Sequence, residues 1–273
     1  MITGKILGKT YVINGVPLDV SGFKPDMSLD IYYEVVRLIE GKLLFLHDHL
    51  DRLKNSLAGS ALEFPGGDTI LKNLSLLLEN NSYSQGNIRI CLQPSTDNNS
   101  DLLCYFVPYF YPEASNYLEG VRLLSYPHIR PNPGIKKWDD GFRSSVGKFI
   151  RDQGIYEAVL LNRKGQITEG SRSNLSFIDQ QGSLVTVPDK QILPGITRKY
   201  VLNIAQQEGI PVIEKSIALD SLDAFTSAFI SGTSPKVLPV KTLDKYSFEV
   251  SHPVLQELMK KFEELIMKNL SAV

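Results

Sequence analysis

The sequence predicts a protein of mixed helices and strands (α/β, or α+β). It is expected to form two domains, residues 1–113 and 120–273, with a linker at 114–119. Alternating apolar and polar residues indicate short strands in both halves, and apolar residues at helical spacing indicate helices between them. The alternation stops near Glu113 and resumes at Val121, which indicates a domain boundary. A chain of 273 residues is long enough to bury a substantial core.

The N-terminal domain is predicted to be a sheet with two helices. Residues 6–20 alternate around Asn14-Gly15, a strong signal for a hairpin. Leucines at helical spacing then predict two amphipathic helices. The elements expected after the hairpin are strands at 32–39 and 42–46, helices at 49–60 and 68–79, and strands at 87–93 and 101–109.

The C-terminal domain is predicted to combine strands with three helices. Gly154 is a plausible left-handed cap for a helix at 144–153, and Pro253 after Ser251-His252 is typical of the first turn of the last helix. The other elements expected are a helix at 196–207 and strands at 120–125, 156–162, 166–168, 174–179, 183–187, 211–217 and 226–231.

Composition indicates an ordinary globular protein, with 42% hydrophobic and 22% charged residues and a net charge of -1. This charge gives no support for a nucleic-acid surface or a basic membrane patch. The longest apolar runs are far shorter than the ~20 residues that span a bilayer, and no signal-peptide pattern is present. Cys91 and Cys104 lie in separate apolar strands, so two reduced, buried thiols and a cytoplasmic location are expected.

Two adjacent lysines follow a loop rich in Pro and Gly at 127–134. A lysine that bonds to an aldehyde must be fixed in place and partly unprotonated, which burial or a neighbouring cation can achieve. The local sequence does not distinguish Lys136 from Lys137, and an ordinary solvated loop lysine is the alternative for both.

Glu169 lies between a short strand and a turn of small residues at 170–174. A carboxylate that contacts a pyridine nitrogen keeps that nitrogen protonated, so that the ring can withdraw electrons from an attached carbanion. The alternative is an ordinary turn glutamate at the end of a strand.

Two turns have the composition of anion sites. Gly195-Ile196-Thr197 opens a helix after a Pro-Gly turn, where free N–H groups and the helix dipole favour an anion. Ser231-Gly232-Thr233-Ser234 offers hydroxyls and amides after a strand. Arg52, on a predicted helix, could contact a phosphate. An ordinary helix start and an exposed arginine are the alternatives.

Three other kinds of site do not fit the sequence. The segment Gly141–Lys148 is followed by Phe149, where a phosphate-binding loop needs Ser or Thr. His47 and His49 are two residues apart without a third ligand at zinc spacing, so no metal is expected. A Gly-x-Ser-x-Gly motif for a serine hydrolase is absent.

Taken together, the chain resembles the class IV (fold-type IV) pyridoxal-phosphate aminotransferases, a group that includes branched-chain and D-amino-acid aminotransferases and aminodeoxychorismate lyase. The matching motifs run in order along nearly the whole chain: Tyr33–Arg37, His49–Leu53, Ile135-Lys136, Tyr156–Ala158, Thr168–Ser171, Leu193–Arg198 and Ser231–Val240. The resemblance implies a small N-terminal domain, a larger C-terminal cofactor-binding domain, pyridoxal 5'-phosphate as cofactor, and a homodimer.

The resemblance also assigns roles to residues. It selects Lys136 rather than Lys137 as the lysine that bonds the cofactor, and it places Glu169 at the pyridine nitrogen. The other cofactor-binding positions that it implies are Arg52, Ser173, Asn174, Gly195, Ile196, Thr197, Gly232, Thr233 and Ser234.

The residues expected to bind substrate match none of these subfamilies. Gln93-Pro94-Ser95 stands where D-amino-acid enzymes carry an arginine, and Trp138–Phe142 stands where branched-chain enzymes carry a tyrosine. The side chains considered for the substrate are Tyr33, Arg130, Trp138, Arg143 and Arg172.

The implied activity is the transfer of an amino group between an amino acid, with branched-chain amino acids among the candidates, and a 2-oxo acid. One alternative on the same cofactor is a 4-amino-4-deoxychorismate lyase that releases pyruvate. A second alternative is a non-catalytic protein that retains the fold. Product analysis separates the first two, and the absorbance of bound cofactor separates both from the third.

Overall fold

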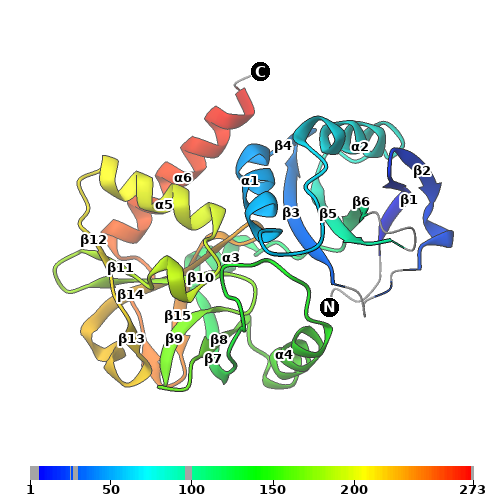
Figure 1. The fold of residues 1–273 in the computed structure, drawn as a ribbon. Coiled ribbons are helices and arrows are strands. Elements are labelled where there is room, and N and C mark those ends of the chain that lie inside the picture. The colour runs from blue at the N-terminus through cyan, green and yellow to red at the C-terminus, as the bar shows by residue number, and fades with distance from the viewer. Residues whose placement is uncertain (1–5, 25, 27–29, 96–99, 272–273) are drawn as a thin grey trace. The chain divides into compact units, whose positions relative to one another are not determined.

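The computed structural model describes residues 6–24, 26, 30–95 and 100–271. The N-terminal residues 1–5, where no signal peptide is expected, lie outside this part of the chain. The chain divides into two compact units (Figure 1). Unit 1 comprises the residues up to Phe110, Ile135–Gly141 and the residues from Asn269 onward, and unit 2 comprises Tyr111–Gly134 and Phe142–Lys268.

Unit 1 is built on a six-stranded antiparallel sheet in the order β2-β1-β6-β5-β3-β4, against which two helices pack (Figure 1). At the β1–β2 turn Asn14 and Gly15 have φ of 49° and 81°, which confirms the predicted hairpin. The elements are β1 (Leu7–Ile13), β2 (Val16–Asp19), β3 (Tyr32–Ile39), β4 (Lys42–Leu43), α1 (Leu46–Ser56), α2 (Gly67–Glu79), β5 (Gly86–Pro94) and β6 (Ser100–Val107).

The two faces of this sheet carry different cores. Val36 and Leu38 of β3 pack with the leucines of α1 and α2, whereas Tyr33 packs on the other face with Tyr105 and Trp138. Side chains alternate along a strand, so Glu34 lies on the helix side of β3. The pleat of one strand therefore directs an aromatic ring and a carboxylate to opposite faces.

Residues 135–141 pack with unit 1, although they follow the predicted domain boundary. Tyr33 N donates to Lys136 O over 3.1 Å, and Trp138 N donates to Ile31 O over 2.8 Å. The segment thus pairs with the start of β3, and Lys137 forms an isolated antiparallel bridge with Tyr32.

Unit 2 contains a ten-stranded mixed sheet in the order β12-β11-β10-β14-β15-β7-β8-β9-β13, with β16 paired to β15. Its helices are α3 (Ala114–Glu119), α4 (Asp140–Gln153), α5 (Ile196–Gln207) and α6 (Pro253–Ser271), and the ends of α4 and α6 extend into unit 1. Its strands are β7 (Val121–Pro127), β8 (Glu157–Leu161), β9 (Gln166–Gly170), β10 (Asn174–Asp179), β11 (Leu184–Thr186), β12 (Val212–Glu214), β13 (Ile217–Ala218), β14 (Phe225–Gly232), β15 (Lys236–Leu243) and β16 (Tyr246–Ser247).

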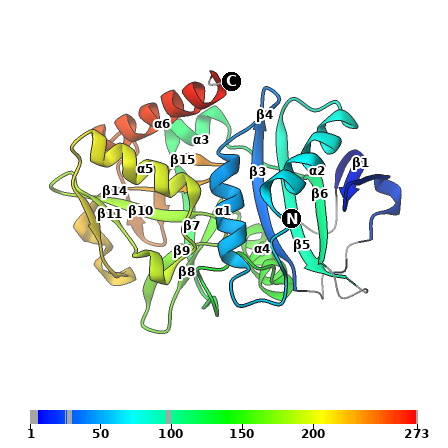
Figure 2. The same ribbon diagram turned by 45° about the horizontal axis from the view of Figure 1, so that its top comes forward.

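Helices α3, α4 and α5 pack against the sheet of unit 2. Phe142 and Val146 of α4 pack on Ala158 and Leu160 of β8. Helices α5 and α6 lie side by side (Figures 1 and 2), where Lys261 of α6 pairs with Glu208 at the end of α5 over 3.3 Å. Residues 114–119, expected as a linker, form α3.

Two further sequence expectations have structural outcomes. Gly154 ends α4 with φ of 59°, which confirms the expected left-handed cap. Cys91 and Cys104 are both buried free thiols, as expected. None of the helices in the described residues is long and apolar enough to cross a bilayer.

Candidate active site

Lys136 is held through its backbone next to β3 and α1. Its N–H donates to Ser56 Oγ over 3.1 Å, and its carbonyl accepts from Tyr33 N over 3.1 Å. Its Nζ lies 5.2 Å from the centroid of the Tyr33 ring, and its charge lowers the pKa of Glu34. Lys137 instead pairs with Asp30 over 2.8 Å. The structure therefore gives the two adjacent lysines different surroundings.

Glu34 is close enough to Lys136 to feel its charge, and it also binds Arg52. The fully buried Glu34 carboxylate accepts from Arg52 Nε and Nη2, each over 2.7 Å, and lies 2.8 Å from His49 Nδ1. Burial alone would raise the pKa of Glu34, but the Arg52 charge, the hydrogen bonds from Arg52 and His49, and the Lys136 charge bring it well below its usual value. This two-point contact fixes the orientation of the Arg52 guanidinium.

Arg89 on β5 is a buried cation that sequence reasoning missed. Its guanidinium carbon lies 4.7 Å from the Trp138 ring centroid, 5.3 Å from that of Tyr33 and 5.8 Å from that of Tyr105. Nη1 reaches Tyr105 OH at 3.4 Å, whereas Nε and Nη2 have no hydrogen-bond partner within the described residues. Burial raises the pKa of Tyr105 above its usual range, so this hydroxyl carries no countercharge.

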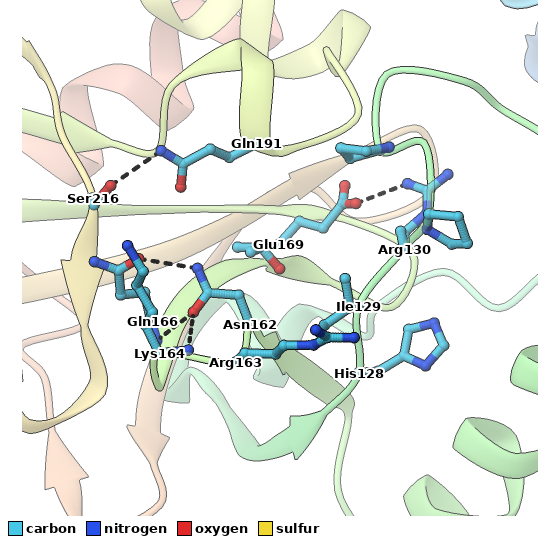
Figure 3. A pocket seen from close by; sticks show the side chains of 13 residues that line it. His128, Ile129, Arg130, Asn162, Arg163, Lys164, Gln166, Glu169, Gln191 and Ser216 are labelled. Atoms are coloured by element: carbon cyan, nitrogen blue, oxygen red, sulfur yellow. Dashed lines mark hydrogen bonds and ion pairs between the residues drawn. The ribbon is translucent and has the colours of Figure 1, made fainter.

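Glu169, near the end of β9 in unit 2, is a buried carboxylate held by two donors. Arg130 Nη1 donates to Oε1 over 2.7 Å, and Leu193 N donates to Oε2 over 3.1 Å. Both Arg130 and Glu169 line a cavity of about 810 Å³ (Figure 3). Arg130, which was a candidate for substrate binding, therefore forms an ion pair with Glu169.

The turn after Glu169 is tightly tied to its surroundings. Ser171 Oγ and Ser173 Oγ both donate to the buried Glu157 carboxylate, over 2.8 and 2.9 Å. Arg143 Nη1 donates to Ser171 O over 2.8 Å. Arg172 Nη2 donates to Tyr156 O over 3.2 Å, with its side chain about half exposed. Two arginines considered for the substrate thus contact the backbone of this turn and of the neighbouring strand.

The predicted anion site at α5 is adjacent to the end of β14. Helix α5 begins at Ile196 without a side-chain cap and without an acidic residue in its first turn. Asn174 Nδ2 donates to Leu193 O over 2.9 Å, and a Cβ at Gly195 would lie 1.8 Å from Asn174 Oδ1, so a larger residue there would displace the hydrogen-bonded Asn174 side chain. Asn174 pairs in register with Ser231, which leads into the turn Gly232-Thr233-Ser234.

Ser231 presents an unsatisfied hydroxyl next to this turn. Its side chain is 1% exposed, and its Oγ has no hydrogen-bond partner within the described residues. Buried hydroxyls are normally paired, and the Ser231 hydroxyl, like the uncapped first amides of α5, is therefore suited to bind an anion.

The predicted site residues thus fall into two groups. Tyr33, Arg52, Lys136 and Trp138 gather around β3 in unit 1, and the remaining predicted residues gather around Glu169, the α5 start and the β14 end in unit 2. Arg89, Glu157 and the Ser231 hydroxyl were not singled out from the sequence. Arg89 did carry a signal, because it is a charge between Ile88 and Ile90 in an apolar strand.

Comparison with known proteins identifies the family. The family model for class IV amino-transferases matches residues 32–243. A D-alanine aminotransferase from Listeria monocytogenes (serotype 4b) is 30% identical over 236 residues, which cover 79% of this chain and 78% of the relative.

Solved structures share the fold. The T.th. branched-chain amino acid aminotransferase, crystallised with pyridoxamine 5'-phosphate, has a TM-score of 0.84 at 21% identity and covers 97% of this chain and 96% of its own. The Escherichia coli branched-chain enzyme has a TM-score of 0.81 at 22% identity, with 95% of each chain covered. The chain therefore belongs to the class IV aminotransferases, a family of pyridoxal-phosphate enzymes, and is a transaminase.

Proposed function

We propose that this transaminase binds pyridoxal 5'-phosphate through Lys136 and moves an amino group between an amino acid and a 2-oxo acid. The observation that carries the proposal is the backbone-fixed Lys136, whose amine lies beside the Tyr33 ring and close to Glu34. A reactive lysine needs such a fixed position. The assignment of Lys136 and Glu169 to the same cofactor rests on the family resemblance.

The residues of unit 2 fit a phosphate ester. The uncapped amides of Ile196 and Thr197 and the orphaned Ser231 hydroxyl offer donors, and the first turn of α5 brings no carboxylate to repel an anion. Gly195 leaves no room for a side chain beside Asn174. We assign phosphate binding in unit 2 to these groups together with Gly232, Thr233 and Ser234, and the family resemblance adds Arg52, which Glu34 orients within unit 1.

When bound, pyridoxal phosphate supplies an aldehyde that condenses with amines and a ring that withdraws electrons. The Nζ atom of Lys136 would then move the proton from the α-carbon of the substrate to the former aldehyde carbon, and it would move a proton in the opposite direction during the second half of the cycle. Glu169, oriented by Arg130 and Leu193 N, would keep the ring nitrogen protonated. By the family resemblance, Ser173 and Asn174 would lie beside the ring.

Arg89 supports a carboxylic substrate with more than one acidic group. A buried guanidinium without a countercharge is costly, and a substrate carboxylate that reached Nε and Nη2 would satisfy it. Lys136 Nζ lies 5.2 Å and the Arg89 guanidinium carbon 5.3 Å from the centroid of the same Tyr33 ring, so the arginine is close to the proposed reactive amine. We therefore propose a dicarboxylic 2-oxo acid such as 2-oxoglutarate as the acceptor.

The same aromatic walls suit an apolar amino donor. The rings of Tyr33, Tyr105 and Trp138 surround Arg89. The aliphatic side chain of a branched-chain amino acid could pack against these rings, in the same space that the second carboxylate of the acceptor occupies. We retain branched-chain amino acids as proposed donors on this basis.

We further propose that the protein works as a homodimer in the cytoplasm. The dimer is implied by the family resemblance, and the two buried free thiols are consistent with a reducing compartment. Light scattering coupled to size-exclusion chromatography tests the dimer, and a monomer at working concentration would contradict it.

The proposed activity is tested by incubating the purified protein with single L- and D-amino acids and either 2-oxoglutarate or pyruvate. We expect a new amino acid to form from the acceptor only when both partners are present. Pyruvate released from 4-amino-4-deoxychorismate without any acceptor would instead support the lyase. A protein that gains no cofactor absorbance on addition of pyridoxal phosphate would contradict both activities.

A further inference from the structure

Glu157 at the start of β8 is a buried carboxylate whose contacts all go to one turn. Oε1 accepts from Ser171 Oγ over 2.8 Å and from Arg172 N over 2.5 Å, and Oε2 accepts from Ser173 Oγ over 2.9 Å. The residue is 2% exposed. Its ion-pair contact is with Arg172 Nε at 3.9 Å, on a side chain that is about half exposed. Three short hydrogen bonds, rather than a close ion pair, stabilise the Glu157 carboxylate.

The turn that Glu157 contacts is tight and is also held by backbone hydrogen bonds. Gly170 N donates to Ser173 O over 2.8 Å, and a Cβ at Gly170 would lie 2.3 Å from Ser173 Oγ. Ser171 N donates to Ala158 O over 2.9 Å, which ties the turn to the neighbouring strand. The carboxylate therefore occupies the inside of the turn and orients both serine side chains toward itself.

This turn connects two residues to which the proposed function gives a role. Glu169 precedes it and Asn174 follows it, and both bond to Leu193, through its N–H and its carbonyl respectively. Leu193 in turn lies two residues before Gly195, where the predicted anion site at α5 begins. A shift in the turn would therefore move the Glu169 carboxylate, the Asn174 side chain and the start of the predicted anion site together.

We propose that Glu157 is a positioning residue for the cofactor site: it fixes the turn 170–173 and thereby sets the positions of Glu169 and Asn174 before the cofactor binds. This inference rests on the proposed function, because it gives the turn a role in cofactor binding. It differs from a purely structural role, since its effect is local to this turn and is present in the cofactor-free protein.

The test compares wild type, Glu157→Ala, Glu157→Gln and the control Glu214→Gln. Glu214 also bears a hydrogen-bonded carboxylate in unit 2, but it contacts Arg198 rather than the turn. Two quantities are measured on the cofactor-free protein: the Kd for pyridoxal phosphate by absorbance titration, and hydrogen–deuterium exchange of peptides that cover 169–175 and, as reference, 225–231.

For Glu157→Ala we expect the Kd to rise on the order of 10- to 100-fold, by analogy with the losses seen when a group that orients a metal ligand is removed. Exchange should accelerate in 169–175 and stay unchanged in 225–231. Glu157→Gln should show a smaller change in the same direction, because its amide oxygen still accepts from Ser171 and Arg172. Glu214→Gln should leave both quantities unchanged.

The inference is overturned if Glu157→Ala binds the cofactor as tightly as wild type, or if exchange rises equally in both peptides. Should Glu157→Ala fail to fold, Glu157→Gln decides by the same two criteria, and an unchanged Kd with unchanged exchange overturns the inference. A wild-type protein that binds no pyridoxal phosphate contradicts the proposed function instead, so the two failures are distinguishable.

Discussion

Arg130 donates a 2.7 Å hydrogen bond to Glu169, and the pair lines a cavity in unit 2 (Figure 3). Glu169→Gln should therefore lower kcat on the order of 10²–10³, the usual loss for one group that stabilises developing charge. The Kd for pyridoxal phosphate should change only a few-fold, because phosphate binding is assigned to other residues. Steady-state kinetics and a cofactor titration check this, with the exposed Glu208→Gln as control. An equal loss in both variants would refute the role of Glu169.

Arg89 should determine which acceptor is used. Arg89→Met keeps a side chain of similar length but removes the charge, so the KM for 2-oxoglutarate should rise about 30-fold or more, the effect of losing one partner of a buried charge pair (about 2 kcal/mol or more). The KM for pyruvate, which lacks the second carboxylate, should change little. Steady-state kinetics with each acceptor measure the two KM values.

The control for this prediction is Arg122→Met, which removes a cation from the exposed face of β7. It should leave both KM values at the wild-type level. If Arg89→Met raises the KM of the two acceptors equally, Arg89 does not bind the second carboxylate.

Two serines on β14 offer a matched pair. Ser227 Oγ donates to Glu249 O over 2.7 Å, whereas Ser231 Oγ has no partner within the described residues. Ser227→Ala should lower the free energy of unfolding by about 1 kcal/mol and leave cofactor affinity unchanged. Ser231→Ala should leave the stability of the cofactor-free protein unchanged and raise the Kd for pyridoxal phosphate about 10-fold, since a hydrogen bond to a charged group contributes about 1.5 kcal/mol.

Urea unfolding and absorbance titration of the cofactor-free variants measure both quantities. The opposite pattern, with Ser231→Ala destabilised and binding normally, would show that the Ser231 hydroxyl has a structural partner and no place in the predicted anion site.

The His49–Glu34 pair should make stability fall on acidification. Burial lowers the pKa of His49 in the folded protein below its usual 6.5. As the pH drops below 6.5, His49 is protonated more readily in the unfolded chain than in the folded protein, so the free energy of unfolding falls. The pKa of Glu34 is also lowered, from 4.5, so its contribution is complete above that value and declines below it. Stability should therefore decrease from pH 7 to 5, and more steeply below 4.5.

His49→Asn removes the titrating ring while its amide can still donate to Glu34. Urea unfolding between pH 7 and 5 should show a flatter dependence for this variant than for wild type. His47→Asn, an exposed position on the same helix, is the control and should keep the wild-type dependence. Equal slopes for wild type and His49→Asn would rule out His49 as the titrating group.

Much of the fold could be predicted from the sequence because local patterns determine it. The Asn14-Gly15 hairpin, the helix at 196–207 and the Gly154 cap each depend on residues adjacent in the chain, and the structure confirms them. Strand β15 was not predicted. It contains Pro239, a residue normally confined to edge strands, yet it lies between β14 and β7.

The candidate site was likewise predictable from the sequence only in part. Motif order identified the family and led to the prediction of Lys136 as the cofactor-bonding lysine, but contacts between distant segments could not be predicted from the sequence. The Arg52–Glu34 and Arg130–Glu169 ion pairs join residues 18 and 39 positions apart, and the aromatic surroundings of Arg89 come from three separate segments. Arg130, Arg143 and Arg172 were considered for the substrate, whereas their contacts within the protein depend on tertiary packing.

The most direct test is to load the protein with pyridoxal phosphate, reduce it with borohydride and digest it. Mass spectrometry with fragmentation between residues 136 and 137 then locates the attached cofactor. We predict one cofactor per chain, covalently attached to Lys136, and no covalent attachment in Lys136→Ala. Attachment to Lys137 or to another lysine, or transamination by Lys136→Ala, would contradict the proposed role of Lys136.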